Sequence, residues 1–157
     1  MSNSVNAMWE AYLQSIGENS ATTNKTFTAW HFCDNAKDAD ELAEFVKQGR
    51  KCATASSFWS YGYEGQAIPK TRSLNMITNW DGQAQCIIQT TRVDIVLFEE
   101  ITEEFAWIEG EGDRSLDYWK KGHWRFFSRT LQVFGREPDT RMPVVCERFE
   151  VVFGRTV

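Results

Sequence analysis

A lysine stands in the short segment Gly49–Thr54, directly after a predicted helix and directly before a predicted strand. Lys51 can project toward a ligand from this place, because its neighbours Cys52 and Ala53 are small. A lysine that is partly removed from water loses some of its preference for the charged form, so it can serve as a base or a nucleophile. The alternative is that Arg50 and Lys51 only complement the negative end of the preceding helix.

A glutamate precedes a glycine-rich acidic segment further along the chain. Glu109 stands directly before Gly110-Glu111-Gly112-Asp113. Glycines let the backbone come close to a ligand, and a carboxylate at such a place can transfer protons. The alternative is that Glu109 is a capping residue or a solvated loop acid.

The charge changes sign after this segment. Acidic residues crowd positions 99–117, where Arg114 is the one basic residue, and positions 118–135 carry Lys and Arg without any acid. Aromatic residues such as Trp119 and Trp124 alternate with these basic residues, and His123 lies between them. Basic and aromatic side chains on one helix suit single-stranded nucleic acid, through phosphate neutralisation and base stacking. The alternative is an amphipathic helix with its aromatic residues in the core and its basic face in solvent.

Familiar enzyme motifs are absent from the sequence. It contains no P-loop, dinucleotide-binding, nucleophile-elbow or His-Glu-x-x-His pattern, which argues against P-loop enzymes, Rossmann oxidoreductases, α/β-hydrolases and zincins. The four cysteines are far apart and only two histidines occur, so a structural zinc site is not expected. We expect neither a metal nor a cofactor.

Composition narrows the class of partner. The 157 residues carry a net charge of −5, and the pI is about 5.1, so a bulk binder of duplex DNA is excluded. Apolar runs are too short to span a membrane, and the first four residues lack the pattern of a signal peptide. We therefore expect a cytoplasmic protein. The sequence predicts no particular oligomeric state.

The elements that must position these residues follow from periodicity and caps. A helix is predicted between Ser4 and Gly17, and Asp81-Gly82 predicts a hairpin between two strands. Residues 57–70 are predicted to be a lid-like loop with a helical turn. The other predicted elements are strand 26–33, helix 36–48, strand 52–56, strands 73–78 and 85–96, helical turns within 99–109, a helix from Ser115 to about Phe134, and strand 144–153. Short strands and predicted hairpins indicate an α+β fold, a small, partly closed, mostly antiparallel barrel of mixed strands with flanking helices.

Several segments in a fixed order carry a resemblance to a known family. They are Ala39–Ala43, Gly49–Ser56, Cys86–Val93, Glu104–Asp113, Ser115-Leu116, Trp119, His123, Phe126-Phe127 and Val144–Val152. With them the chain resembles the ASCH domain proteins of the PUA-like superfamily, and specifically their longer bacterial branch. The resemblance covers roughly residues 27–153, which leaves 1–26 as an N-terminal helix and polar loop and 154–157 as a tail.

The resemblance implies a PUA-like β-barrel whose cleft takes RNA or a modified nucleoside. In the related branch that hydrolyses 4-acetylcytidine, a Lys, a Thr and a Glu carry the reaction, and the matching positions here are Lys51, Thr54 and Glu109. Lys51 would activate the nucleophile or attack itself, Thr54 would position a hydroxyl or water, and Glu109 would move the proton. Lys51 and Thr54 are three residues apart, so this requires Lys51 to precede the strand or the strand to be bulged.

The substrate-binding residues expected around this trio complete the hypothesis. They are Arg50, Ser56, Trp59, Arg92, Glu111, Asp113, His123 and Trp124. Ser56 departs from the superfamily motif, which usually has Arg there, so Arg50, Lys70, Arg72 or Arg92 would have to replace that charge. The alternatives to a nucleoside amidohydrolase are a non-catalytic RNA-binding module and a ribonuclease that uses the same cleft.

Overall fold

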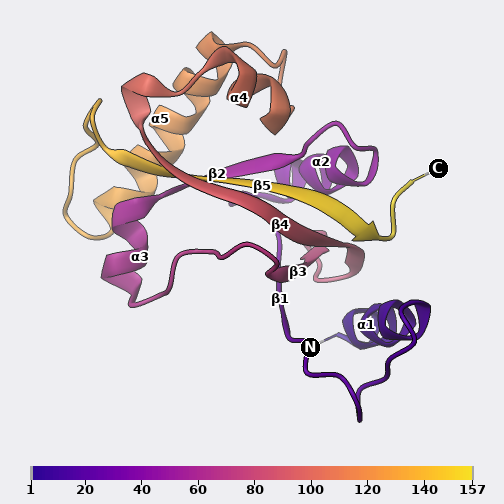
Figure 1. Ribbon diagram of the computed structural model, residues 1–157. Helices are drawn as coiled ribbons and strands as arrows, with labels where there is room; N and C mark the ends of the chain where they lie inside the picture. Colours follow the sequence, from indigo (N-terminus) through magenta and orange to yellow (C-terminus); the bar gives the residue numbers. More distant parts are fainter. Residues whose placement is uncertain (1, 157) are drawn as a thin grey trace. The chain divides into compact units, whose positions relative to one another are not determined.

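The computed structural model describes residues 2–156, so Met1 and Val157, at the outer ends of the expected N-terminal segment and tail, lie outside the described residues. The elements in chain order are α1 (Asn3–Ser15), β1 (Phe27–Trp30), α2 (Ala36–Lys47), β2 (Ala53–Ser57), α3 (Phe58–Glu64), β3 (Leu74–Thr78), β4 (Ala84–Leu97), the 3₁₀ turn η1 (Phe98–Glu100), α4 (Glu103–Glu109), α5 (Leu116–Gln132) and β5 (Pro143–Phe153). Figure 1 shows them along the chain.

The strands form one mixed sheet in the order β1-β3-β4-β5-β2. β1 runs parallel to β3, whereas β3 pairs antiparallel with β4, and β2 pairs antiparallel with β5. The α+β fold is therefore confirmed, but the sheet is open where a partly closed barrel was expected. Closure needs pairing between the edge strands, and these are short, with four residues in β1 and five in β2.

The chain divides into two compact units, and β4 and β5 contribute residues to both. The first unit holds α1, β1, α2, β3 and the hairpin-forming part of β4. Its α1 begins at Ser2, whose hydroxyl accepts from the Val5 amide, and its α2 begins at Asn35, whose side chain accepts from the Asp38 amide. Trp9 and Leu13 of α1 pack with Met76 and Ile87 of the sheet in its core.

The second unit contains residues 50–71 and 90–149, and it carries all the residues of the candidate site. The odd-numbered residues Ala53 and Ala55 of β2 pack with Phe98, Trp119 and Phe127 in its core. Ser115 begins α5 by accepting from the Tyr118 amide, as its position predicted. The expected lid-like loop after β2 contains a seven-residue helix, α3.

Strand and helix bounds agree with most of the predicted elements. The largest difference is the first strand, which is limited to Phe27–Trp30 where 26–33 was predicted. Cys33 adopts a positive φ of 59°, a conformation that an extended strand excludes. Among the described residues, no helix is long and apolar enough to cross a membrane.

Candidate functional site

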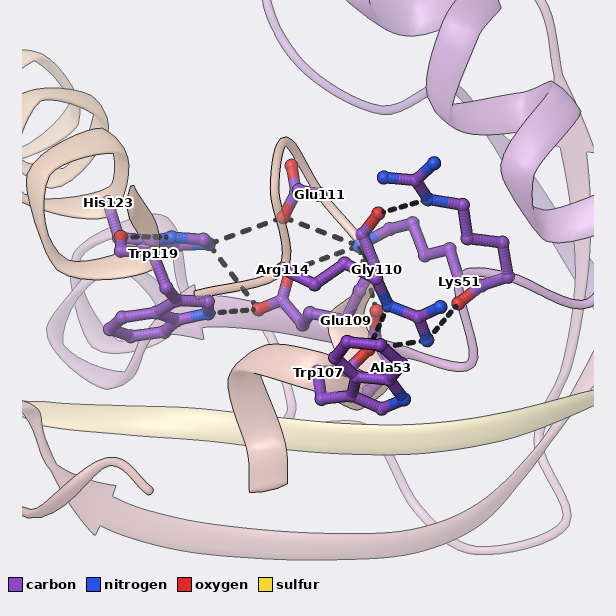
Figure 2. A network of polar contacts seen from close by, with 10 residues as sticks. Lys51, Ala53, Trp107, Glu109, Gly110, Glu111, Arg114, Trp119 and His123 are labelled. Carbon is purple, nitrogen blue, oxygen red and sulfur yellow. Dashed lines mark hydrogen bonds and ion pairs between the residues drawn. The ribbon is translucent and has the colours of Figure 1, made fainter. Parts of the chain in front are cut away.

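Lys51 lies in the turn that leads into β2, so the requirement that it precede the strand is met. The backbone of Cys52 fixes this turn, because its amide donates to the Ile108 carbonyl (2.9 Å) and its carbonyl accepts from the Phe149 amide (3.0 Å). The Lys51 side chain is only 1% exposed. Its Nζ donates to the Ala53 carbonyl (2.8 Å) and to Glu109 Oε2 (3.0 Å) (Figure 2). Lys51 is therefore a buried ion-pair partner and not a solvated end of a helix.

Glu109 is the last residue of α4 and is also 1% exposed. Gly110 ends the helix in the left-handed region (φ 75°), and a Cβ there would overlap the Arg50 carbonyl, so the close approach requires glycine. Glu109 Oε1 accepts from Trp119 Nε1 (2.9 Å) while Oε2 accepts from Lys51. Both oxygens of this carboxylate are thus occupied, and the alternative of a solvated loop acid does not hold.

The ionisation of Glu109 follows from its neighbours. Burial alone would raise the pKa of this carboxyl, but the positive charges of Lys51 and His123 outweigh burial and hold it well below 4.5. Glu109 is therefore a permanent carboxylate near neutral pH, and its charge balances that of Lys51.

Glu111 and His123 complete what we call the charged cluster, which consists of Lys51, Glu109, Glu111 and His123. Glu111 Oε2 lies 3.6 Å from Lys51 Nζ and 3.7 Å from His123 Nε2, and His123 Nε2 lies 3.4 Å from Glu109 Oε1. The Glu111 side chain is 21% exposed and that of His123 is 13% exposed. These two side chains therefore form the accessible side of the cluster, with Lys51 and Glu109 behind them.

The histidine is held in one orientation. Its Nδ1 lies 2.8 Å from the Trp119 carbonyl, and a carbonyl can only accept, so Nδ1 carries a hydrogen and Nε2 faces the carboxyl groups. The imidazole also stacks on the Trp119 ring, with centroids 4.0 Å apart and an interplanar angle of 14°. Trp119 thus orients both His123 and Glu109.

The pKa values of both accessible groups are raised above their ordinary values. Burial is the main reason that the pKa of Glu111 rises from 4.5 to about 7, and the nearby charge of Glu109 adds to this rise. For His123, burial alone would lower the pKa, but the charges of Glu109 and Glu111 outweigh burial and raise it above 6.5. A carboxyl with a pKa of about 7 beside an imidazole that favours its protonated form is suited to general acid–base chemistry.

Two arginines hold the loop that carries Glu111. Arg50 donates through Nε to the Gly110 carbonyl (2.8 Å) and through Nη2 to the Gly112 carbonyl (2.5 Å). Arg114, itself at a positive φ of 66°, donates to the Trp107 carbonyl through Nε (2.9 Å) and Nη2 (2.8 Å) and stacks on the Trp107 ring (Figure 2). The loop is thereby fixed at both ends, which positions the Glu111 carboxyl against Lys51.

The cluster also has the donor atoms of a cation site. The ligand atoms of Glu109, Glu111 and His123 all lie within 4.8 Å of one another, so these three residues could hold a metal ion. The Lys51 ammonium, however, already lies 3.0 Å from Glu109 Oε2 and 3.6 Å from Glu111 Oε2. The cluster therefore has a positive charge of its own at the place where a cation would be attracted.

Other predicted site residues make their contacts outside the charged cluster. Thr54 is paired with Glu147 across the β2–β5 ladder, on the strand face opposite to Ala53 and Ala55. Ser56 shares a hydrogen bond with the Tyr61 hydroxyl (2.8 Å).

The remaining predicted residues have local partners. The Arg136 guanidinium lies 3.3 Å from the centre of the Trp59 ring, and Arg92 forms an ion pair with Asp94 (2.6 Å). Asp113 accepts from the Ser115 amide, and Trp124 packs edge-on against Phe98.

The basic and the aromatic residues of α5 lie on different faces of the helix. Trp119 and Phe127 are buried, and Trp124 and Phe126 pack against the same core. Lys121 is exposed and pairs with Asp117 one turn away (3.0 Å). This arrangement is that of an amphipathic helix, and it leaves these aromatic rings in the core.

Sequence reasoning did not assign two residues that shape the site. The sequence places Trp119 in an aromatic helix and among the residues of the family resemblance, and its i, i+4 spacing to His123 is the signal that places both on one helix face. Arg114 was noted only as an isolated positive charge. Composition indicates neither its positive φ nor its hydrogen bonds to the Trp107 carbonyl.

The comparisons with known proteins agree with the fold. A family model described as ASCH domain matches residues 28–153. The crystal structure of an ASCH domain from Lactobacillus crispatus is similar, with a TM-score of 0.90 and 34% identity over 98% of this chain and 96% of that chain. A protein from Enterococcus faecalis has a TM-score of 0.86 and 32% identity over 98% of this chain and 90% of its own.

The remaining comparisons support no more than the fold. A hypothetical protein is similar with a TM-score of 0.52 and 16% identity over 80% of this chain and 97% of its own. No curated protein matches the sequence.

Proposed function

The chain belongs to the ASCH domain family, and from that premise we propose that its charged cluster hydrolyses the amide bond of an acylated, cytidine-like nucleoside. The observation that carries this proposal is the contact of Glu111, with its pKa of about 7, with both Lys51 and His123 on the accessible side of the cluster. A general acid or base works best when its pKa lies near the working pH. The substrate class comes from the resemblance to the 4-acetylcytidine hydrolases.

The reaction uses the protons of the cluster and one water molecule. The Glu111 carboxylate takes a proton from the water, whose oxygen attacks the acyl carbon. The tetrahedral intermediate then collapses, the carbon–nitrogen bond breaks, and the Glu111 carboxyl returns the proton to the leaving amine. The products are a carboxylic acid and the free nucleoside amine, so atoms and charges balance.

The other cluster residues act around this proton transfer. The protonated His123 supplies positive charge and an Nε2–H donor for the oxyanion of the intermediate. Lys51 and Glu109 are buried, so they are positioning residues that fix Glu111 and His123 and set their protonation. This assigns to Glu111 the proton transfer that the resemblance alone would assign to Glu109.

The test is a turnover assay with product analysis. Wild type, Glu111→Gln, His123→Ala and the control Glu103→Gln, which changes an exposed acid of α4, would be incubated with 4-acetylcytidine and with short single-stranded RNA. We expect release of cytidine and acetate by wild type and the control, and a loss of about 10²–10⁴-fold in kcat/KM for Glu111→Gln.

The alternatives give different products. Shortened RNA would indicate the ribonuclease. Intact RNA retained by the protein, with no nucleoside turned over, would indicate the binding module. Full turnover of 4-acetylcytidine by Glu111→Gln would contradict the assignment of Glu111.

A further inference from the structure

The second unit contains a cavity that the charged cluster does not use. Its volume is about 550 Å³, which lies in the range of small-molecule sites. It is lined by Phe58, Trp59, Tyr61, Gly62, Tyr63, Gln66, Ile68 and Arg136. All but Arg136 come from α3 and the residues that follow it, so one short helix forms most of the wall. We call this the α3 cavity.

One positively charged side chain, that of Arg136, lines the cavity together with the aromatic rings. The central carbon of the Arg136 guanidinium lies over the Trp59 ring, 3.3 Å from its centre, and Nη1 makes only a long contact of 3.5 Å with the Tyr63 hydroxyl. Among the described residues, 2–156, no carboxylate forms an ion pair with Arg136. A guanidinium held over a ring by a cation–π contact keeps N–H donors that can meet an anion.

Contacts hold two tyrosine rings of the cavity in place. The Tyr61 hydroxyl is bonded to Ser56 Oγ (2.8 Å), and Tyr63 stacks on Phe134 with centroids 4.7 Å apart and an interplanar angle of 8°. Phe58 and Tyr63 nevertheless remain 37% and 47% exposed. Exposed aromatic surface that is already ordered offers a stacking platform at little further entropic cost.

We propose that the α3 cavity binds a planar aromatic ring that carries an anionic group. The ring stacks on the exposed tyrosine and phenylalanine faces, and the anion accepts from the free edge of the Arg136 guanidinium, in the manner of charge-assisted recognition. A nucleoside monophosphate and an aromatic carboxylate share this chemistry. No residue of the cavity belongs to the charged cluster, so this inference does not depend on the proposed reaction.

Calorimetric titration with four defined probes tests this inference. The probes are CMP, its neutral counterpart cytidine, 2-naphthoate and its neutral counterpart 2-naphthamide. We expect at least one anionic probe to bind wild type about tenfold more tightly than its neutral counterpart, as hydrogen bonds to one charged group imply. CMP and 2-naphthoate distinguish a nucleotide from an aromatic acid as the source.

Substitutions locate the binding. Arg136→Gln should abolish the preference for the anionic probe, whereas the control Arg141→Gln, which removes an exposed arginine paired with Glu99, should keep it. Arg136 is exposed, so this variant is expected to fold. Equal affinity for charged and neutral probes, or a preference that survives Arg136→Gln, would overturn the inference. CMP binding that is lost in Glu111→Gln but kept in Arg136→Gln would place the ligand at the charged cluster and overturn it as well.

Discussion

At the scale of single residues, the buried pair Lys51–Glu109 should be essential for stability. Lys51→Met leaves the Glu109 carboxylate buried with Trp119 and His123 as partners, and breaking such a pair costs about 3–5 kcal/mol of unfolding free energy. Chemical denaturation measures this loss. The control Lys121→Met removes an exposed i, i+4 pair and should cost about 0.5 kcal/mol or less. A loss below about 1 kcal/mol for Lys51→Met would show that the pair is not buried as described.

The ionisation of Glu111 should appear as a pH dependence of stability. Its pKa is about 7 in the folded chain against an ordinary value of 4.5, so the folded state holds the proton more tightly. The resulting stabilisation is complete below pH 4.5 and is lost as the pH rises through 7. The difference in unfolding free energy between wild type and Glu111→Gln should therefore fall by roughly 3 kcal/mol between pH 4.5 and pH 8.

Denaturation of wild type and Glu111→Gln at several pH values checks this dependence. A difference between wild type and Glu111→Gln that stays constant or grows with pH would mean that Glu111 is ionised throughout this range.

At the scale of elements, the end of α4 depends on one glycine. Gly110→Ala puts a side chain at a φ of 75° and against the Arg50 carbonyl, so it should cost about 2 kcal/mol or more. It should also lower any turnover, because it displaces Glu109 and Glu111 on either side. Thermal and chemical unfolding measure the cost.

The matched control is Gly122→Ala in α5, where a Cβ meets no atom within 4 Å. This substitution should leave the chain as stable as wild type or stabilise it by about 1 kcal/mol. If both alanine variants were equally stable, the close approach of Gly110 to Arg50 would not exist in solution.

The elements themselves could largely be predicted from the sequence, because caps and turns are local signals. Ser115 and the Asp81-Gly82 turn each mark the element that the structure shows. The charged cluster could be predicted only in part. Lys51 and Glu109 are 58 residues apart, and their pairing was expected only from the family resemblance. The stacking of Arg136 on Trp59 depends on packing between α3 and the loop after α5, which no local pattern encodes.

At the scale of the whole molecule, the aromatic residues bear on the cores and the net charge bears on the ligand. Many of the aromatic residues lie in the two cores, such as Trp9 and Tyr12 in one unit and Phe98 and Phe127 in the other. The net charge of −5 disfavours a long polyanion as the ligand. A small neutral nucleoside fits both observations.

A neutral nucleoside as substrate predicts how salt affects the rate of turnover. The kcat/KM for 4-acetylcytidine should change less than about twofold between 50 and 500 mM salt, because the substrate is neutral and the cluster is largely buried. Binding of a short RNA would instead weaken steeply over this range, since each neutralised phosphate releases counterions. Steady-state kinetics and RNA titrations at three salt concentrations separate the two. A steep loss of nucleoside turnover with salt would contradict a neutral substrate.

The proposed reaction requires that Glu111 exchange a proton near neutral pH beside Lys51 and His123. An NMR titration of the carboxyl carbons in protein labelled with ¹³C-glutamate tests it directly, and it needs no substrate. We predict one glutamate resonance with a midpoint near pH 7 that is missing in Glu111→Gln. If the glutamate resonance that is missing in Glu111→Gln has a midpoint below pH 5.5 in wild type, Glu111 is an ordinary acid and the proposed proton transfer is contradicted.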